Sequence, residues 1–396
     1  MGANIAKIPL WNSNYIKVWI ANFFMFFSFY LLLPLLPVYM VDEFDASKQI
    51  IGIALSGYTI TALLVRPFSG YLVDSFPRKQ ILLIFYFSFF VFFTGYLLAG
   101  TLLLFTIVRT LHGVPFGGAT VANSTMAIDV LHPQRRAEGI GYYGLSNNLA
   151  MAIGPTVAVF VYENTHNFDI LFCLSLAISA LGLIINATLK VAPREIIENK
   201  KAMSLDRFFL LKGWSEGITI ACVAGSYGVL STYLAIYCQQ KFGSTADTGT
   251  FFLILACGLM LSRLIGGKQL RQGKIAENAA HGLLLSLTGY ILFVTVPNHI
   301  GFFGTAIIIG LGNGHICPAL QNMFINLAPH SLRGTANSSF LVSWDVGQGA
   351  GMMAGGFVAE YFGYTEAFLL ALAINITGVL SFFLITRKSY LRNKLR

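Results

Sequence analysis

The stretch GYLVDSFPRK, residues 70–79, decides the fold of this chain. It places one acid, Asp74, and two bases, Arg78 and Lys79, in a short turn between two long apolar runs. A second polar turn, GKQLRQGK, begins at Gly267 and is similar to the first. In both copies an arginine precedes the first glycine by four residues, and the copies are 197 residues apart (263 − 66 and 267 − 70). A repeat at about half the chain length predicts a duplicated architecture.

The composition predicts an all-α integral membrane protein. Of the 396 residues, 56% are hydrophobic and only 11% are charged, and the mean hydropathy is +0.69. Soluble domains carry about 25% charged residues, so this chain has too few charges to cover a globule in water. The net charge of +9 does not indicate a nucleic-acid partner, because the bases fall in short connections and tails and do not line one helix face.

Apolar runs of about 20 residues are long enough to cross a hydrocarbon layer of about 30 Å as helices. Twelve such runs predict twelve transmembrane helices. They cover residues 17–40, 50–72, 79–98, 101–128, 136–162, 168–190, 213–240, 247–266, 277–296, 299–326, 333–360 and 364–386.

The basic residues predict the orientation of the chain. Of the 26 Lys and Arg residues, 23 fall in the tails or at connections on one side of this plan. Lys48 and Lys241 fall in opposite loops, and Arg109 falls inside a span. Because cytoplasmic loops are enriched in Lys and Arg, both termini are expected in the cytoplasm.

The same offset recurs along the chain and predicts two homologous halves in parallel orientation. The polar connection after the sixth run divides the chain into a bundle of residues 1–190, a cytoplasmic linker of residues 191–212 and a bundle of residues 213–396 with a basic tail. The landmark pairs are Arg136 and Arg333, Gly113 and Gly310, Gly117 and Gly314, Asn148 and Asp345, and Gly154 and Gly351.

Along nearly its whole length, the chain resembles a major facilitator superfamily transporter. Residues 70–79 are similar to that family's loop motif Gly-x-Leu-x-Asp-Arg-x-Gly-Arg-Lys, although Ser75 and Pro77 depart from it. The segments IVRTLHGVPFGG, residues 107–118, and DVLHPQRRAEGIG, residues 129–141, resemble motifs of the drug:proton antiporter branch. The fifth-helix antiporter motif is kept only in part, as Gly154 and its following proline. The resemblance implies two pseudo-symmetric six-helix bundles, a central cavity and alternating access.

The charged turns form a candidate cytoplasmic gate. Acids and bases at the inner helix ends are expected to pair when the cavity opens outward and to separate when it opens inward. The alternative is a solvated loop, where single ion pairs contribute about 0–1 kcal/mol. The gate candidates are Gly70, Asp74, Arg78, Lys79, Asp129, Arg136 and Arg333.

Charged residues inside spans are the candidates for proton coupling or substrate binding, because a charge at the membrane centre costs about 2.5–3.5 kcal/mol or more. Asp345 lies near the middle of its span, and Arg109 carries His112 three residues further along. A permanent pair of Asp345 with Arg109 or His315, or a direct substrate contact, is the alternative role of that acid. His112 and His315 predict no metal site, since neither has a second His or an acid at i+3 or i+4.

Polar side chains inside the spans are candidates to line the cavity, with hydrogen bonding between helices as the alternative. They are Asn22, Tyr30, Asn147, Asn148, Tyr227, Tyr233, Asn313, Gln321, Trp344 and Gln348.

The sequence therefore predicts a secondary active transporter of the inner cell membrane and not an enzyme. No nucleotide-binding or hydrolase motif is present, and no cofactor is expected. The predicted partners are a small-molecule substrate, protons or another coupling ion, and lipid, around a monomer. Proton-coupled export of a small hydrophobic or amphipathic compound is the first hypothesis. A proton symporter or facilitator that imports a sugar, an organic acid or another nutrient is the alternative.

Overall fold

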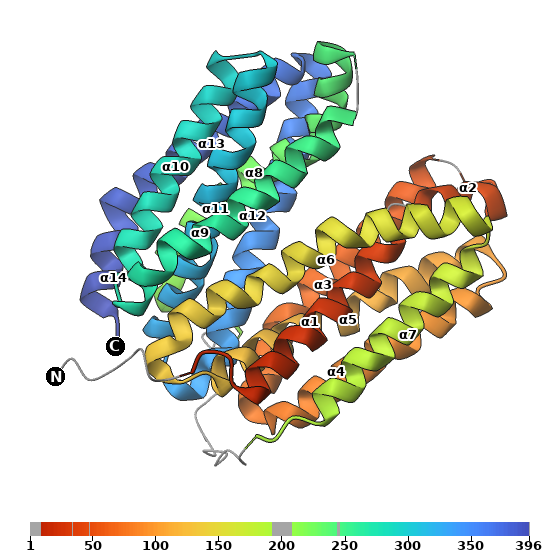
Figure 1. Cartoon of the computed structure of the whole chain (residues 1–396), viewed down its shortest axis with the longest axis horizontal. Coiled ribbons are helices and arrows are strands. Elements are labelled where there is room, and N and C mark those ends of the chain that lie inside the picture. Colours follow the sequence, from red (N-terminus) through yellow and green to blue (C-terminus); the bar gives the residue numbers. More distant parts are fainter. Residues whose placement is uncertain (1–8, 34, 47, 192–207, 244–245, 396) are drawn as a thin grey trace. The chain divides into compact units, whose positions relative to one another are not determined.

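The structure is a computed structural model that describes residues 9–33, 35–46, 48–191, 208–243 and 246–395. These residues form helices joined by short turns (Figure 1). The first half contains α1 (Ser13–Leu32), α2 (Leu36–Phe44), α3 (Lys48–Ser75), α4 (Arg78–Leu98), α5 (Leu102–Val130), η2 (Pro133–Arg135), α6 (Arg136–Thr165) and α7 (Phe168–Ala187). The second half contains η4 (Leu211–Gly213), α8 (Trp214–Phe242), α9 (Ala246–Arg271), α10 (Ile275–Thr295), α11 (His299–Leu327), η5 (His330–Leu332), α12 (Arg333–Tyr361), α13 (Tyr364–Ser381), η6 (Phe382–Thr386) and α14 (Arg387–Asn393).

The helix bounds repeat with the offset that the sequence shows. The first and last residues of α10 and α11 lie 197 positions after those of α4 and α5, and the bounds of η5 lie 197 positions after those of η2. The caps repeat too, because the side chain of Thr101 accepts a hydrogen bond at the start of α5 and that of Asn298 does so at the start of α11. Such caps satisfy N–H groups that lack a partner within the helix. The predicted duplication is confirmed.

Close helix pairs are also duplicated. A Cβ added at Gly113 on α5 would lie 2.0 Å from the carbonyl oxygen of Tyr58 on α3, and one at Gly310 on α11 would lie 2.2 Å from that of Leu255 on α9. Side chains larger than glycine would force these backbones apart. Glycine at 197-residue spacing thus brings α3 against α5 and α9 against α11.

The chain forms two compact units. Unit 1 comprises the described residues of 1–139, 143–208 and 331–338, and unit 2 those of 140–142, 209–330 and 339–396. The first turns of α12 therefore belong to unit 1, and the rest of this helix to unit 2. Residues 192–207, most of the linker expected at 191–212, lie outside the described residues, so the linker stays a prediction.

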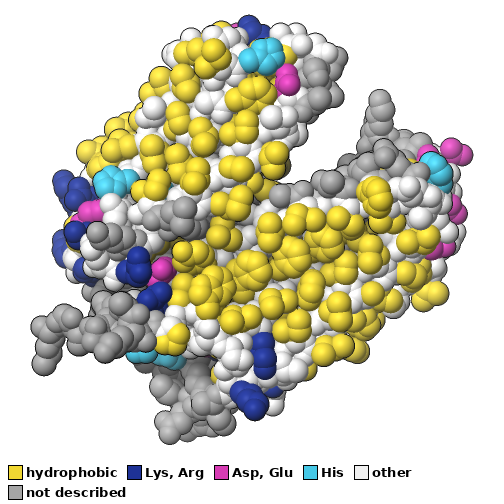
Figure 2. All heavy atoms as spheres, in the orientation of Figure 1, with side chains coloured by type: hydrophobic (Ala, Val, Ile, Leu, Met, Phe, Trp, Pro, Cys, Tyr) yellow, Lys and Arg dark blue, Asp and Glu magenta, His cyan; other side chains and the backbone are white. Residues whose placement is uncertain are grey.

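Among the described helices, nine stretches have the length and hydropathy of a membrane span. Helices α3, α6 and α12 have 28, 30 and 29 residues, which at 1.5 Å per residue is also enough to cross a bilayer. Large apolar side chains such as Leu64, Ile84 and Phe160 are more than half exposed. On the face drawn in Figure 2, hydrophobic side chains cover the flanks of the helices and charged ones gather at helix ends.

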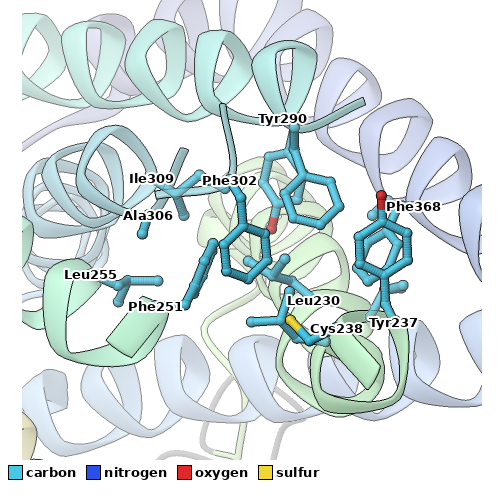
Figure 3. Close-up of a cluster of buried hydrophobic side chains, with 14 of the residues drawn as sticks. Leu230, Tyr237, Cys238, Phe251, Leu255, Tyr290, Phe302, Ala306, Ile309 and Phe368 are labelled. Carbon is cyan, nitrogen blue, oxygen red and sulfur yellow. The ribbon is translucent and has the colours of Figure 1, made fainter. Parts of the chain in front are cut away.

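The interior of unit 2 is an apolar cluster (Figure 3). Phe251 on α9 packs against Phe302 on α11 with ring centroids 4.8 Å apart, and Tyr237 on α8 lies 5.0 Å from Phe368 on α13. Aromatic pairs at such distances stabilise a core beyond the area that they bury.

Candidate functional site

The turn of residues 70–79 brings an acid and a base together. Pro77 has no N–H group to bond back into the preceding helix, and it disfavours helical geometry at the residue before it. Helix α3 therefore ends at Ser75, and α4 begins at Arg78. The Arg78 guanidinium therefore reaches back across the turn, and its Nη2 lies 3.0 Å from Oδ1 of Asp74. Both side chains are about 5% exposed, so the pair is screened little by water.

Asp74 also caps the start of α12, within unit 1. Its Oδ1 accepts a hydrogen bond from the Gly334 N–H at 2.9 Å, and its Oδ2 accepts from the N–H and the hydroxyl of Thr335 at 2.7 and 3.0 Å. The N-terminal N–H groups of a helix carry partial positive charge and bind anions. One carboxylate thus holds both Arg78 and the first turn of α12.

Asp129, at the end of α5, extends the cluster. It accepts a hydrogen bond from Nη1 of Arg78, and its Oδ1 lies 3.6 Å from Nη1 of Arg333, the first residue of α12. Arg333 is 2% exposed. Two acids and two arginines therefore form one charge-balanced group at the junction of α3, α4, α5 and α12.

Gly70 has a steric role in the same place. A Cβ at this position would lie 2.7 Å from Cβ of Ser338, so a larger residue would displace α12 from α3. Ser338 in turn donates from its hydroxyl to the Arg66 carbonyl at 2.6 Å, and Asn337 donates to the hydroxyl of Ser124 on α5. Five predicted gate residues, Gly70, Asp74, Arg78, Asp129 and Arg333, therefore meet at the start of α12.

The other two predicted gate residues make different contacts. Nζ of Lys79 donates to the carbonyl of Leu189 at 2.8 Å, after the end of α7. Nε of Arg136 donates to the carbonyl of Ile128 at 3.0 Å and so braces the turn between α5 and α6. Both bonds tie neighbouring helix ends within unit 1.

Burial changes the acidity of Asp74, which lies beyond the apolar run of residues 50–72. Loss of water raises the pKa of this carboxyl above its ordinary value, while Arg78 and the donors of Gly334 and Thr335 act in the opposite direction. Burial disfavours the charged form of an acid, and nearby donors favour it. Asp74 therefore takes up a proton at a higher pH than an exposed aspartate does.

A second polar group lies inside unit 1. Nη1 of Arg109 donates to the hydroxyl of Tyr96 at 3.2 Å, and that hydroxyl lies 2.8 Å from Nδ1 of His112. Nε2 of His112 lies 3.0 Å from the carbonyl oxygen of Phe89, to which it must donate. In the neutral tautomer with the proton on Nε2, Nδ1 accepts from Tyr96 and the three side chains form one hydrogen-bonded row.

Arg109 is buried, and its guanidinium carbon lies 4.1 Å from the centroid of the Tyr58 ring. Within the described part of the chain, no acid lies at ion-pair distance from it, and its Nε has no hydrogen-bond partner. A ring face stabilises such a cation by about 2 kcal/mol when water is excluded.

The repeat shows that this polar group is not required by the fold. The positions 197 residues after Tyr58, Tyr96, Arg109 and His112 hold Leu255, Phe293, Ala306 and Ile309, all members of the apolar cluster of unit 2 (Figure 3). The same helix packing is thus built without charge in the second half. Sequence reasoning missed Tyr58 and Tyr96, although comparison of the two repeats at this offset marks both positions.

The predicted acid of unit 2, Asp345, is half-buried on α12. One residue before it, Trp344 donates from Nε1 to the side-chain oxygen of Gln348 at 3.0 Å, and Tyr227 on α8 has its ring 6.1 Å from that of Trp344. His315 is buried on α11, and a Cβ at Gly266 on α9 would touch its ring at 2.8 Å. The structure thus brings Trp344 together with Gln348 and Tyr227, next in sequence to Asp345.

Two predicted cavity residues make hydrogen bonds between helices. Asn22 on α1 donates to the hydroxyl of Ser146 and accepts from Tyr143, both on α6, at 2.7 and 2.6 Å. Tyr233 on α8 donates to the carbonyl of Met352 on α12 at 2.7 Å. The remaining candidates are Asn313, which is buried, and Tyr30, Asn147, Asn148 and Gln321, which are partly buried.

Comparison with known proteins identifies the family. The model of the Major Facilitator Superfamily matches residues 18–276 and 279–395. The chain belongs to the Major Facilitator Superfamily. The matched members of this family are transporters and not enzymes. The chain is therefore a membrane transporter with the twelve-helix fold that the sequence predicts.

Relatives and structural neighbours agree with this assignment. The chain is 24% identical to the staphylopine export protein of Staphylococcus aureus (strain Mu50 / ATCC 700699) over 90% of this chain and 93% of the relative. It is 23% identical to the quinolone resistance protein NorA of S. aureus (strain COL) over 90% and 92%. The Major Facilitator Superfamily transporter FucP, in its outward conformation, has the same fold at a TM-score of 0.79 and 14% identity, over 95% of this chain and 99% of FucP.

Proposed function

We propose that this transporter exports a small hydrophobic or amphipathic compound in exchange for protons, by alternating access between a bundle of residues 1–190 and a bundle of residues 213–396. The observation that carries the proposal is the group of Asp74, Arg78, Asp129 and Arg333 at the start of α12. Breaking these charge-assisted bonds would loosen the first turn of α12, and this provides a gate.

Proton coupling is assigned to Asp345 and to the row of Arg109, Tyr96 and His112. Asp345 is an acid in the middle of a span, where ionisable residues are rare and serve transport paths. The polar row is absent from the matching positions of the second half, which supports a role in transport in addition to its contribution to stability. We assign the cavity to the polar residues around Trp344 and Tyr227, and expect the protein to act as a monomer with both termini in the cytoplasm.

The export direction draws support from relatives whose names record staphylopine export and quinolone resistance. A symporter or facilitator for a nutrient is the second candidate, because the antiporter motif of the fifth helix is incomplete at Ala158 and Val159.

Reconstituted vesicles distinguish the two. The purified protein is inserted into liposomes with a pH-sensitive dye inside, a pH gradient is imposed in either direction, and a fluorescent quinolone or staphylopine is added. Antiport predicts that the compound accumulates in the compartment that loses protons, and that adding it accelerates collapse of the gradient. Movement of compound and protons in the same direction, or flux that ignores the gradient, contradicts the proposal.

A further inference from the structure

Glu216, in the first turn of α8, is a buried acid that the proposed mechanism does not use. Its side chain belongs to unit 2 and is fully buried. Oε2 accepts a hydrogen bond from the hydroxyl of Ser215 at 2.9 Å, while Oε1 is buried without a hydrogen-bond partner among the described residues. No cation in the described part of the chain pairs with this carboxyl.

Segments η4, α11 and η6 pack against α8, whose first turn carries Glu216. On α11, the ring of Phe324 would contact a Cβ at Gly213, just before α8. In η6, the hydroxyl of Thr386 donates to the Ser215 carbonyl at 3.0 Å and lies 2.9 Å from that of Thr219. The first turn of α8, which carries Glu216, thus packs against a ring of α11 and a hydroxyl group of η6.

The described charged and titratable groups near the first turn of α8 do not form an ion pair with the Glu216 carboxyl. Tyr390 on α14 lies within electrostatic range of both Glu216 and Glu277, the latter an exposed acid of α10. The Tyr390 hydroxyl accepts from Asn326 on α11 at 3.0 Å. Arg387, which follows Thr386, is half-buried, and its Nε has no hydrogen-bond partner among the described residues.

We propose that Glu216 is a proton-binding site of unit 2, distinct from the coupling residues assigned above, and that the carboxyl carries its proton in the state described. A buried carboxylate without a partner cation is strongly unfavourable, and neutralisation by a proton removes that cost. The positive end of α8 favours the charged form, and Ser215 donates to Oε2, but Oε1 is buried without a hydrogen-bond partner among the described residues. Loss of the proton would leave an uncompensated negative charge inside unit 2.

Infrared spectroscopy tests the site without any substrate, so its failure and the failure of the transport proposal are separate results. The C=O stretch of protonated carboxyl groups is recorded for the full-length protein in nanodiscs from about pH 6 to about pH 9. We expect the isosteric variant Glu216→Gln to lose part of this band, and the matched variant Glu277→Gln, with its exposed acid, to keep all of it. Ser215→Ala removes the bond to Oε2 and should shift the band without abolishing it.

The thermal midpoint gives an independent measurement if a spectral change is small. The folded protein holds the proton and the unfolded chain releases it, so the wild-type midpoint should fall as pH rises over this range, and that of Glu216→Gln should fall less. Identical carboxyl bands in the wild type and in Glu216→Gln overturn the proposal, as do equal pH dependences of their midpoints.

Discussion

At the scale of single residues, Asp74 combines two tasks that are usually separate. Its carboxylate pairs with Arg78 and also accepts the N–H groups of Gly334 and Thr335 at the start of α12. Hydrogen bonds to a charged group contribute about 1.5–3 kcal/mol each, roughly twice the value of neutral ones. The charge of this one side chain therefore sets how firmly the first turn of α12 is held.

Replacing Asp74→Asn keeps the shape of the side chain and removes its charge. We expect transport of the compound identified in vesicles to fall about tenfold or more, because a change of about 1.4 kcal/mol corresponds to a factor of ten. Expression should change little, while the thermal midpoint should fall, because Arg78 and the first turn of α12 lose a charged partner. The matched control is Asp169→Asn, an exposed acid at the start of α7, which should transport normally. Full activity of Asp74→Asn would refute the gate.

The raised pKa of Asp74 gives this contact a pH dependence. The ionised carboxylate binds the start of α12, so the contact is complete above the pKa and is lost as pH falls through it. Because burial raises the pKa, the loss begins at milder acidity than for an exposed aspartate. The ratio of wild-type to Asp74→Asn transport should therefore be largest near neutral pH and approach one in acid. A ratio that stays constant with pH would contradict this assignment.

Tyr96 is the residue on which the buried polar row depends. The change Tyr96→Phe leaves Nη1 of Arg109 and Nδ1 of His112 without their shared hydroxyl, and each unsatisfied buried group costs about 1–3 kcal/mol. Thermal unfolding in detergent should show a clear loss of stability. Tyr86→Phe, also buried on α4, removes a single bond to the Ala21 carbonyl and should cost less. Equal losses would show that the row contributes nothing extra.

At the scale of elements, the packing of α12 on α8 depends on which glycines face the neighbour. A Cβ at Gly351 would lie 2.1 Å from the carbonyl oxygen of Gly225 on α8, whereas one at Gly349 would meet nothing within 4 Å. Both glycines lie in unit 2 on the same helix. They therefore form a matched pair for testing this packing.

The substitution Gly351→Ala should destabilise the protein by about 1–3 kcal/mol, as overpacking does. Gly349→Ala should be neutral or stabilise by about 0.5–1 kcal/mol, because alanine restricts the unfolded chain more than glycine does. Thermal midpoints of the two variants in detergent provide the comparison. If both variants unfold at the same temperature, the close contact with Gly225 does not limit the packing of these helices.

At the scale of the whole molecule, the distribution of Lys and Arg predicts the orientation in the membrane. A fluorescent protein fused after Arg396 should fold and fluoresce, and alkaline phosphatase fused there should be inactive, since it needs the oxidising side of the membrane. Phosphatase fused after His166, in the turn between α6 and α7, should be active. Activity at Arg396 and none at His166 would invert the proposed topology.

Much of the fold could be read from the sequence, because the signals are local and repeated. Length and apolarity alone identify helices in a bilayer, since every backbone polar group there must be satisfied within its own segment. The duplication at 197 residues was visible in Arg136 and Arg333 and in Gly113 and Gly310. The helix bounds and glycine contacts confirm it.

The candidate site was predictable only in part, because it depends on contacts between distant segments. The sequence indicated Asp74 and Arg78 as a pair, but not that Thr335, 261 residues away, binds the same carboxylate. It indicated Arg109 and His112, but not that Tyr96 joins them. Nothing in the sequence singled out Glu216.

By itself the sequence determined the membrane environment, the twelve helices and their duplication, because these follow from composition, periodicity and spacing. The family was indicated by the resemblance of its motifs. Only the tertiary structure decided which polar groups share a partner, which acid is left with an unpartnered oxygen and which glycine faces a backbone. The physical reason is that hydrogen bonds and ion pairs act over about 3–4 Å, a distance that packing fixes and that separation along the chain does not.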